Sequence, residues 1–256
     1  MIPGVLNQQG VAGWSPLSLD GDPDNPLRLW WDFSDPAQVT LSGSDITGIN
    51  DQSSNNQDGS VPATRLSPTL ASAAFNGRNM AQFDALTEML TSTGFPTTTF
   101  VAVFMVVSRG ASTADTVLAG NNGTSFWGAA KDGDISTDIK SAVYATEGTW
   151  YVNGVAFNTA FGAQRRNELF DAIYNAGGTR PRVMLQDDGY LSAEYGPGGY
   201  TSASWTPDYL IGEIIIIERP LNLLNANREK IEGYLAWKWG VQADLPAGHP
   251  YLAGPP

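Results

Sequence analysis

Apolar residues in this chain fall mostly in short runs separated by turn-forming residues. The regular part begins with residues 27–33 (LRLWWDF), and residues 80–83 and 100–107 (FVAVFMVV) follow the same pattern. Runs of this length between Gly, Pro, Asn and Asp are typical of β-strands. Residues 150–157 (WYVNGVAF) carry Asn153-Gly154 at their centre, which favours a type I′ turn. These segments predict antiparallel strands and at least one tight hairpin.

Residues 210–218 (LIGEIIIIE) are apolar at both alternating positions of a strand. A strand with this pattern needs cover on both of its faces. One face can pack on an opposite sheet, whereas the other needs a separate element.

The chain supplies such an element directly afterwards. Leu224, Ile231 and Leu235 are spaced as on one side of a helix, which we expect over about 222–239. Gly240 follows at the position where a helix commonly stops. The pattern therefore predicts a C-terminal helix lying against the isoleucine-rich strand or the sheet edge beside it.

Residues 1–26 show no sustained period of either kind, and we separate them from a single domain over 27–256. One interpretation is a partly disordered leader. The other is an extended N-terminal arm that docks on another subunit, because its apolar content is high for a solvated tail. The candidate docking residues are Ile2, Val5, Leu6 and Trp14.

Composition narrows the class of protein. Only 16% of the 256 residues are charged, while Gly numbers 28 and Pro 16, which favours an all-β domain rich in turns. The net charge of −12 disfavours nucleic acid and anionic membranes as partners. The absence of cysteine excludes disulfides and thiolate sites. No apolar run is long enough to span a bilayer and no secretory signal is evident, so we expect synthesis in a cytoplasm without membrane insertion.

Several motifs along the chain resemble one family in their order. They are WWDFSDPAQVT (30–40), NDQSSNNQDGS (50–60), NGRNMAQFD (76–84), FVAVFMVV (100–107), GEIIIIERPL (212–221), EGYLAWKWG (232–240) and LPAGHPY (245–251). This order resembles the concanavalin A-like, laminin-G-type jelly-roll modules of phage virion proteins and some bacterial surface proteins. The aromatic helix with its HPY tail is the most specific part.

The resemblance implies a two-sheet antiparallel jelly-roll sandwich with one C-terminal helix. It further implies a non-enzymatic phage virion structural protein, a lectin-like module used in capsid decoration or at the tail, that aids attachment to host-surface carbohydrate. We expect such a protein on the virion surface, after synthesis in the host cytoplasm, as a homo-oligomer bound to other virion proteins through its N-terminal arm. The alternatives are a free carbohydrate-binding module or a bacterial surface adhesin, and then a glycoside hydrolase.

Carboxylates at catalytic spacing are absent from the sequence. Glucanases of this fold carry E-x-D-x-E or E-x-D-x-x-E on one strand, whereas Glu213 and Glu218 lie five residues apart and so point to opposite faces. The only histidine, His249, has no G-x-S-x-G nucleophile to serve. We therefore predict no catalytic residue and interpret His249 as a packed tail residue.

Two segments combine aromatic residues with glycine or polar neighbours, as a sugar-stacking platform would. They are residues 195–205 (YGPGGYTSASW) and the pair Phe126-Trp127. The predicted carbohydrate-binding residues are Asn121, Asn122, Trp127, Tyr195, Tyr200 and Trp205. In the other interpretation, these aromatic residues close the edge of the core or a subunit contact.

An oxygen-rich segment, KDGDISTDIK (131–140), is a candidate Ca²⁺ site through Asp132, Asp134 and Asp138. It lacks the full EF-hand pattern, so ordinary turn aspartates are the alternative. No other cofactor is expected from the sequence.

Overall fold

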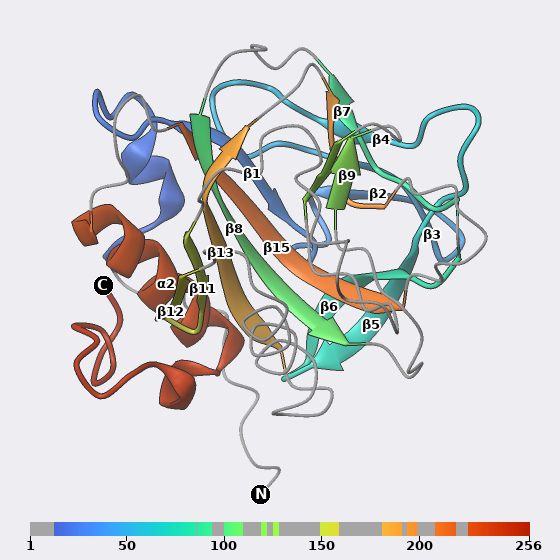
Figure 1. Ribbon diagram of the computed structural model, residues 1–256. Coiled ribbons are helices and arrows are strands. Elements are labelled where there is room, and N and C mark those ends of the chain that lie inside the picture. Colours follow the sequence, from blue (N-terminus) through green and yellow to red (C-terminus); the bar gives the residue numbers. More distant parts are fainter. Residues whose placement is uncertain are drawn as a thin grey trace, which may run out of the picture.

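The computed structural model of the chain describes residues 13–85, 87–93, 100–109, 119–121, 125–127, 149–158, 181–190, 194–198, 208–218 and 225–256 (Figure 1). Apart from two short 3-10 turns, regular structure in these ranges consists of β-strands and one α-helix, α2 (Asn225–Trp239). All the strand pairs are antiparallel. The predicted all-β class is confirmed. Within the described residues, no helix has the length and apolar character needed to cross a membrane.

The strands form one large open sheet and two small ones. The bounds are β1 Leu27–Asp32, β2 Val39–Ser42, β3 Asp45–Ile49, β4 Gly59–Ser60, β5 Thr69–Phe75, β6 Arg78–Phe83, β7 Ser92–Thr93, β8 Phe100–Arg109, β9 Ala119–Asn121, β10 Ser125–Trp127, β11 Thr149–Val152, β12 Val155–Asn158, β13 Arg182–Tyr190, β14 Glu194–Tyr195 and β15 Tyr209–Glu218. The 11-stranded sheet runs β12-β11-β13-β8-β15-β6-β5-β3-β2, with β1 paired to β15 and β4 to β3. The pairs β10-β9 and β14-β7 stand apart from it. The finer expectation of a two-sheet jelly roll stays a prediction.

Strand β15 lies at the centre of the large sheet. One of its edges pairs with β8 from end to end, while the other edge pairs with β6 at Tyr209–Ile211 and with β1 from Glu213 onward. Gly212 lies at the change of partner, where the register also shifts. A Cβ at this position would lie 2.3 Å from Cη2 of Trp239, so glycine is required for the helix to approach the sheet.

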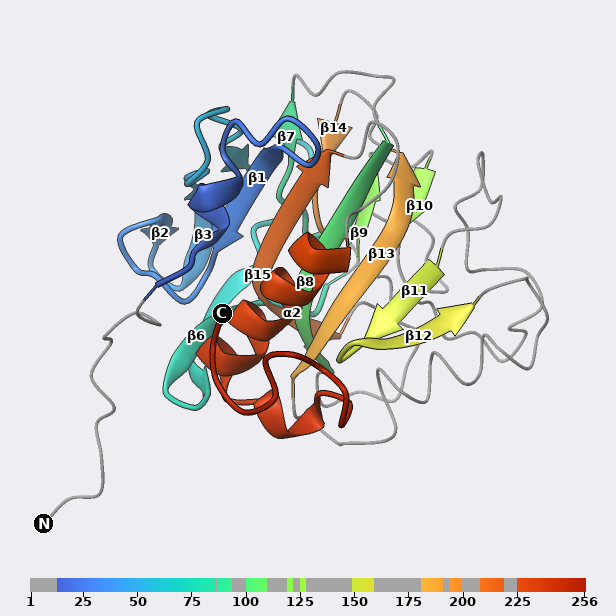
Figure 2. The same cartoon turned by 90° about the vertical axis from the view of Figure 1, so that its left-hand side faces the viewer.

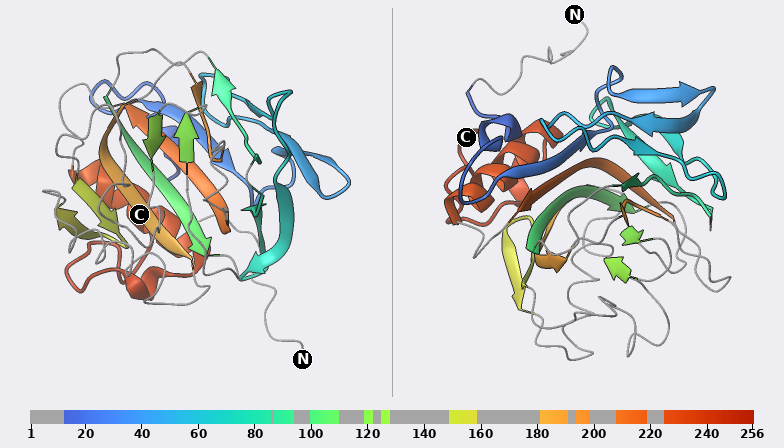
Figure 3. Two further views of the ribbon diagram at one scale, coloured as in Figure 1. Left: turned by 45° about the vertical axis from the view of Figure 1, so that its right-hand side comes forward. Right: turned by 90° about the horizontal axis from the view of Figure 1, so that it is seen from above.

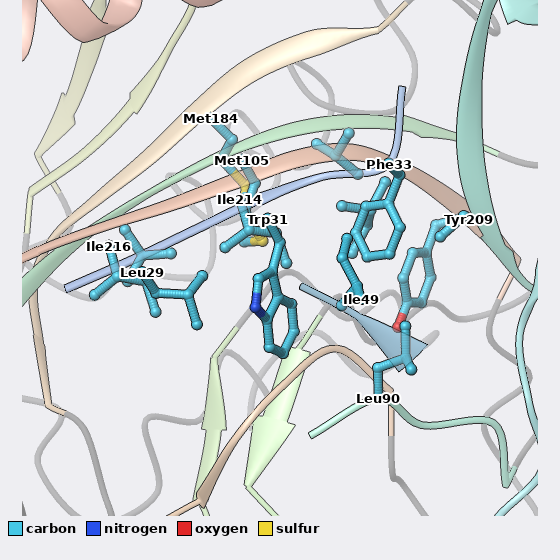
Figure 4. Packing of buried hydrophobic residues seen from close by; sticks show 14 of the residues in the cluster. Leu29, Trp31, Phe33, Ile49, Leu90, Met105, Met184, Tyr209, Ile214 and Ile216 are labelled. Atoms are coloured by element: carbon cyan, nitrogen blue, oxygen red, sulfur yellow. The ribbon is translucent and has the colours of Figure 1, made fainter. Parts of the chain in front are cut away.

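Both faces of β15 are covered, as its apolar pattern predicted. Ile214 and Ile216 belong to one core cluster, shown in Figure 4 with residues of β1, β3, β8 and β13. Ile215 and Ile217 belong to a second cluster, formed with the apolar side of α2. Figures 2 and 3 show α2 across one face of the large sheet and the small strands β9 and β10 beyond the other. Each fully buried isoleucine contributes about 2 kcal/mol to folding.

The C-terminal helix ends where the sequence indicated. Gly240 takes a φ of +68°, its N–H bonds to Trp237 O, and the N–H of Val241 bonds to Ala236 O at 2.8 Å. These two bonds form a Schellman motif. The helix begins at Asn225, and the part of the predicted 222–239 range that precedes it lies outside the described residues.

The turn between β5 and β6 caps the same helix end. Asn76 and Gly77 both have positive φ, as in a type I′ turn. The Asn76 amide donates to Trp239 O at 3.0 Å, and Arg78 Nε donates to Lys238 O at 2.7 Å. The NGR motif therefore satisfies helix carbonyls that would otherwise lack partners.

The predicted Asn153-Gly154 hairpin is confirmed. The two residues join β11 to β12 with φ values of 49° and 78°. Asn153 also fixes the turn to β13, because its side-chain oxygen accepts a bond from Val183 N at 2.9 Å.

The described part of the predicted arm over 1–26 begins at Gly13 and packs on the body of the same chain. Residues Pro16–Leu19 form a 3-10 turn rather than an extended segment. Trp14 lies edge-on against Tyr234 with ring centroids 5.9 Å apart, and Asn227 donates to buried Asn25 at 3.2 Å. The docking candidates Ile2, Val5 and Leu6 lie outside the described residues, and docking of Trp14 on a partner stays a prediction.

Candidate functional site

Three of the predicted carbohydrate-binding residues lie on short strands that neighbour one another. Asn121 ends β9 and Trp127 ends β10, and these strands pair as a hairpin with Asn121 opposite Ser125. Tyr195 lies on β14, which runs close to β9. The strands β9 and β10 lie on the side of the large sheet away from α2 (Figures 2 and 3). The backbone thus brings together segments that are distant in sequence, while the binding role of these residues stays a prediction.

The other predicted ligand-binding residues fall outside the described part of the chain. For the carbohydrate site these are Asn122, Tyr200 and Trp205, and for the Ca²⁺ site Asp132, Asp134 and Asp138. The described residues contain no group of three or more His, Asp or Glu side chains arranged to hold a metal ion. The Ca²⁺ site stays a prediction.

A buried charged group lies between α2 and the sheet, and we call it the lysine cluster: Lys238, Asp32 and Glu213. Asp32 and Glu213 are direct partners in the β1–β15 ladder, which brings their side chains together. Lys238 reaches them from the last turn of α2, with Nζ 2.5 Å from Asp32 Oδ2 and 2.7 Å from Glu213 Oε2. Glu213 is fully buried, and the Lys238 side chain is only 11% exposed.

Aromatic side chains enclose the lysine cluster. The indole N–H of Trp30 donates to Glu213 Oε1 at 2.7 Å, and that of Trp239 donates to Oε2 at 2.9 Å. The Lys238 ammonium lies over the rings of Trp30 and Tyr234, 5.9 and 5.5 Å from their centroids. Water is therefore largely displaced around the three charged groups.

The enclosure changes the acidity of two groups. Burial raises the pKa of Glu213, the charge of Asp32 raises it further, and Lys238 lowers it. Burial, together with the charges of Glu213 and Asp32, raises the pKa of Tyr234 well above its ordinary value. One cation, Lys238, therefore faces two carboxyl groups, Asp32 and Glu213.

Asp32 has two differently engaged oxygens. Oδ2 faces Lys238, whereas Oδ1 accepts bonds from the Ser34 backbone N–H at 3.0 Å and from the Ser34 hydroxyl at 2.7 Å. The carboxyl group is therefore held in one orientation, with an amine at one oxygen and two hydrogen-bond donors at the other.

A second buried group fixes the chain terminus to the helix. Glu232 is fully buried, and its carboxylate binds Arg228 Nη1 at 3.1 Å and lies 3.3 Å from His249 Nε2. His249 is a packed tail residue, as predicted. A Cβ on Gly233 would lie 2.6 Å from the Cβ of Tyr251, so glycine allows the HPY tail to lie on α2.

The polar loop over 50–60 is also engaged by the chain itself. Asp51 Oδ1 accepts the Trp30 N–H at 2.8 Å and Oδ2 accepts the Gln57 N–H at 2.9 Å. The carbonyl of Gln57 accepts the indole N–H of Trp31 at 2.9 Å. This loop therefore holds β1 in place.

The sequence interpretation missed the lysine cluster. The catalytic spacing pairs Glu213 only with Glu218, and no sequence motif assigns a role to Lys238 or Asp32. A signal was present, because Glu213 is the single charge inside an apolar strand and must find a partner when buried. Lys238 lies between Trp237 and Trp239, which also indicates a buried setting.

A scan against protein-family models and searches of curated proteins and of solved structures found no match. The resemblance to concanavalin A-like modules therefore rests on the order of the sequence motifs alone.

Proposed function

We propose that this protein is a non-enzymatic surface module of a phage virion that attaches to host-surface carbohydrate through the face bearing β9, β10 and β14. One observation carries the carbohydrate part of the proposal. Asn121 and Trp127 belong to the β9–β10 hairpin on the side away from α2, and Tyr195 comes from β14, which is distant in the chain yet runs close to β9. Loops and short strands on a rigid scaffold are common places for binding sites.

The rigid scaffold is supported by the groups packed under α2. Glu213, Glu232 and Asp32 are buried and bound by side chains of the same chain. Carboxyl groups held by these partners face the interior of the protein and do not meet an external substrate. This arrangement favours binding over catalysis as the role of the module.

We further infer the two-sheet jelly roll that the resemblance implies. Its support is the first core cluster, which gathers residues from distant strands of the large sheet. Ile46 and Ile49 of β3 pack there with Val103 of β8 and Met184 of β13. Strands on opposite sides of β15 thus contribute to one core, as in a strongly curved sheet.

Binding to a glycan array tests the carbohydrate part. We expect the unmodified protein to bind a defined set of glycans and Trp127→Ala to lose that binding. Trp14→Ala is a matched control, because Trp14 lies against Tyr234 of α2, and it should bind as the unmodified protein does. Equal binding by Trp127→Ala and the unmodified protein would contradict the proposed face.

Location on the particle tests the virion part. Electron microscopy of intact particles should place the protein on the capsid lattice or at the tail. Removing residues 1–12 should prevent incorporation while leaving glycan binding intact, since residues 13–26 pack on the body and should be kept.

A free carbohydrate-binding module or bacterial adhesin is the second candidate. It is favoured by the packing of residues 13–26 on their own chain, which leaves less of the arm for a partner. If the protein without residues 1–12 enters particles at the normal level, those residues have a role other than docking. Absence of the protein from purified particles would support the free module.

A further inference from the structure

The lysine cluster contains the reacting groups of an amide bond in contact. Lys238 Nζ lies 2.5 Å from Asp32 Oδ2, so the carboxyl carbon is only one covalent bond further away. The two residues are 206 positions apart and come from α2 and β1. Reacting atoms held at such a separation have already lost most of the freedom that opposes a bimolecular reaction.

We propose that Lys238 and Asp32 condense to an intramolecular amide, which cross-links α2 to β1, and that Glu213 transfers the protons. The proposal is independent of the glycan-binding function.

The reaction balances without any oxidant or co-reactant. One proton moves from the ammonium to the Asp32 carboxylate, which gives a neutral amine and a carboxylic acid. The Nζ lone pair attacks Cγ of Asp32, a C–N bond forms and Oδ1 takes the displaced electron pair. Glu213 donates its proton to Oδ2, the C–Oδ2 bond breaks, and a water molecule leaves as the carbonyl re-forms. Glu213 then recovers a proton from the nitrogen and ends as it began.

The hydrogen bonds around the cluster suit the attack on Asp32 and the proton transfer from the nitrogen. Negative charge develops on Oδ1 during the attack, and this oxygen already accepts two bonds from Ser34. Donors aimed at a developing oxyanion are a large source of rate enhancement. Glu213 Oε2 is 2.7 Å from Nζ, within reach for proton transfer, and two indole N–H groups hold its carboxyl group in place. Because burial raises its pKa, Glu213 takes up a proton more readily than an exposed glutamate does.

The surroundings also favour the product. Keeping an ion pair away from water costs free energy, because both ions lose their hydration. The amide is uncharged, so condensation removes two buried charges. The rings of Trp30 and Tyr234 cover the nitrogen and limit the access of water that would reverse the reaction.

Lysine is essential to the proposal, and it distinguishes this cluster from its neighbours. The other ion pairs among the described residues are made by arginine or by His249. An arginine guanidinium keeps its proton in proteins and does not act as a nucleophile.

The mass of the intact, purified full-length protein tests the proposal. We expect a mass lower than that of the sequence by one water molecule, and a branched peptide joining the Asp32 and Lys238 segments after proteolysis. A protein with the full sequence mass and only linear peptides would overturn the proposal.

Three variants exclude other sources of a lost water, such as cyclisation at an Asp-Gly pair. Lys238→Arg keeps a cation but should restore the full mass, and a mass loss that persists in this variant would overturn the proposal. Asp32→Asn should lose ammonia instead of water. Lys230→Arg, on the same helix, is the matched control and should show the same loss as the unmodified protein.

Glu213→Gln tests the proton transfer. It preserves the shape and keeps an acceptor for one of the two indole N–H groups, but it cannot shuttle a proton. We expect the folded variant to show the full mass, or to lose water at least tenfold more slowly in a time course after synthesis. Complete condensation at an unchanged rate would overturn the role of Glu213. If this variant does not fold, the peptide map of the unmodified protein still decides whether the bond exists.

Discussion

Two fully buried glutamates lie at helix α2, one on the adjacent strand and one in the helix itself, and they have different cationic partners. Glu213 reaches the helix from β15 and shares Lys238 with Asp32. Glu232 belongs to the helix itself and lies between Arg228 and His249. Arginine stays protonated in proteins, so Glu232 has a permanent cationic partner. We call Arg228, Glu232 and His249 the clamp, because they hold the C-terminal tail on α2. Of these cations only lysine carries an amine that can form an amide, so the lysine cluster can both anchor the helix and form the proposed cross-link.

The largest expected effect is the loss of Lys238. In Lys238→Met, two carboxyl groups remain buried without a cation, and we expect the free energy of unfolding to fall by about 3–5 kcal/mol. His249→Ala should cost less, about 1–2 kcal/mol, because Arg228 still binds Glu232. Urea unfolding measures both values. An equal loss of unfolding free energy in the two variants would contradict this order and show that the clamp and the lysine cluster contribute equally to stability.

Two glycines give a second way to compare the two sides of α2. We expect Gly212→Ala to destabilise the fold by about 1–3 kcal/mol, because its Cβ would overlap the fully buried ring of Trp239. Gly233→Ala should cost less, because Tyr251 is only half-buried, so the tail can move away from the new Cβ, and because alanine is favoured over glycine inside a helix. Gly248→Ala is the control, because a Cβ there meets nothing within 4 Å. Thermal unfolding of the three variants gives the order, and a larger loss for Gly233→Ala would reverse the comparison.

The stability of the protein should depend on pH through Glu213. Its pKa is raised on folding by burial, so the folded state keeps a proton that the unfolded chain releases. This contribution is fully present below the unfolded pKa and is lost as pH rises through the folded pKa. We expect the unmodified protein to lose stability relative to Glu213→Gln as pH rises from about 4 upward. The quantity to measure is the unfolding free energy of the unmodified protein minus that of the variant, which should decrease.

The comparison with Glu213→Gln is needed because burial also raises the pKa of Glu88, which gives a slope of the same sign. The Glu88 contribution cancels in the difference between the two proteins. A difference that stays constant from acid to neutral pH would contradict a raised pKa at Glu213.

The smallest expected effect concerns the cap on the helix end. Asn76→Gly keeps the positive φ of the turn but removes the bond to Trp239 O, and we expect a loss of about 1 kcal/mol. The control is Asn56→Gly, which also replaces an asparagine at a positive-φ position on the surface. Chemical denaturation of both variants checks this, and equal stability would show that the cap bond is not needed.

Local patterns predicted several elements of the fold, although not strands such as β5 and β13. The double-sided apolar run over 210–218 predicted a strand covered on both faces, and the structure shows α2 and a core cluster on its two sides. Asn153-Gly154 predicted its hairpin and Gly240 the end of the helix. Each of these features depends on a few residues close together in the chain, so the sequence alone determines them.

The contacts between distant elements were decided by the tertiary structure. Asp32 and Lys238 meet because the register of β1 on β15 and the glycine at 212 together set where α2 lies. Residues 13–26 pack on the body of the chain, with Trp14 against Tyr234. No periodic pattern in the local sequence indicates this contact. Such contacts join residues far apart in the chain, and their free energy depends on the whole packed arrangement. Periodicity along the sequence carries no information about that arrangement.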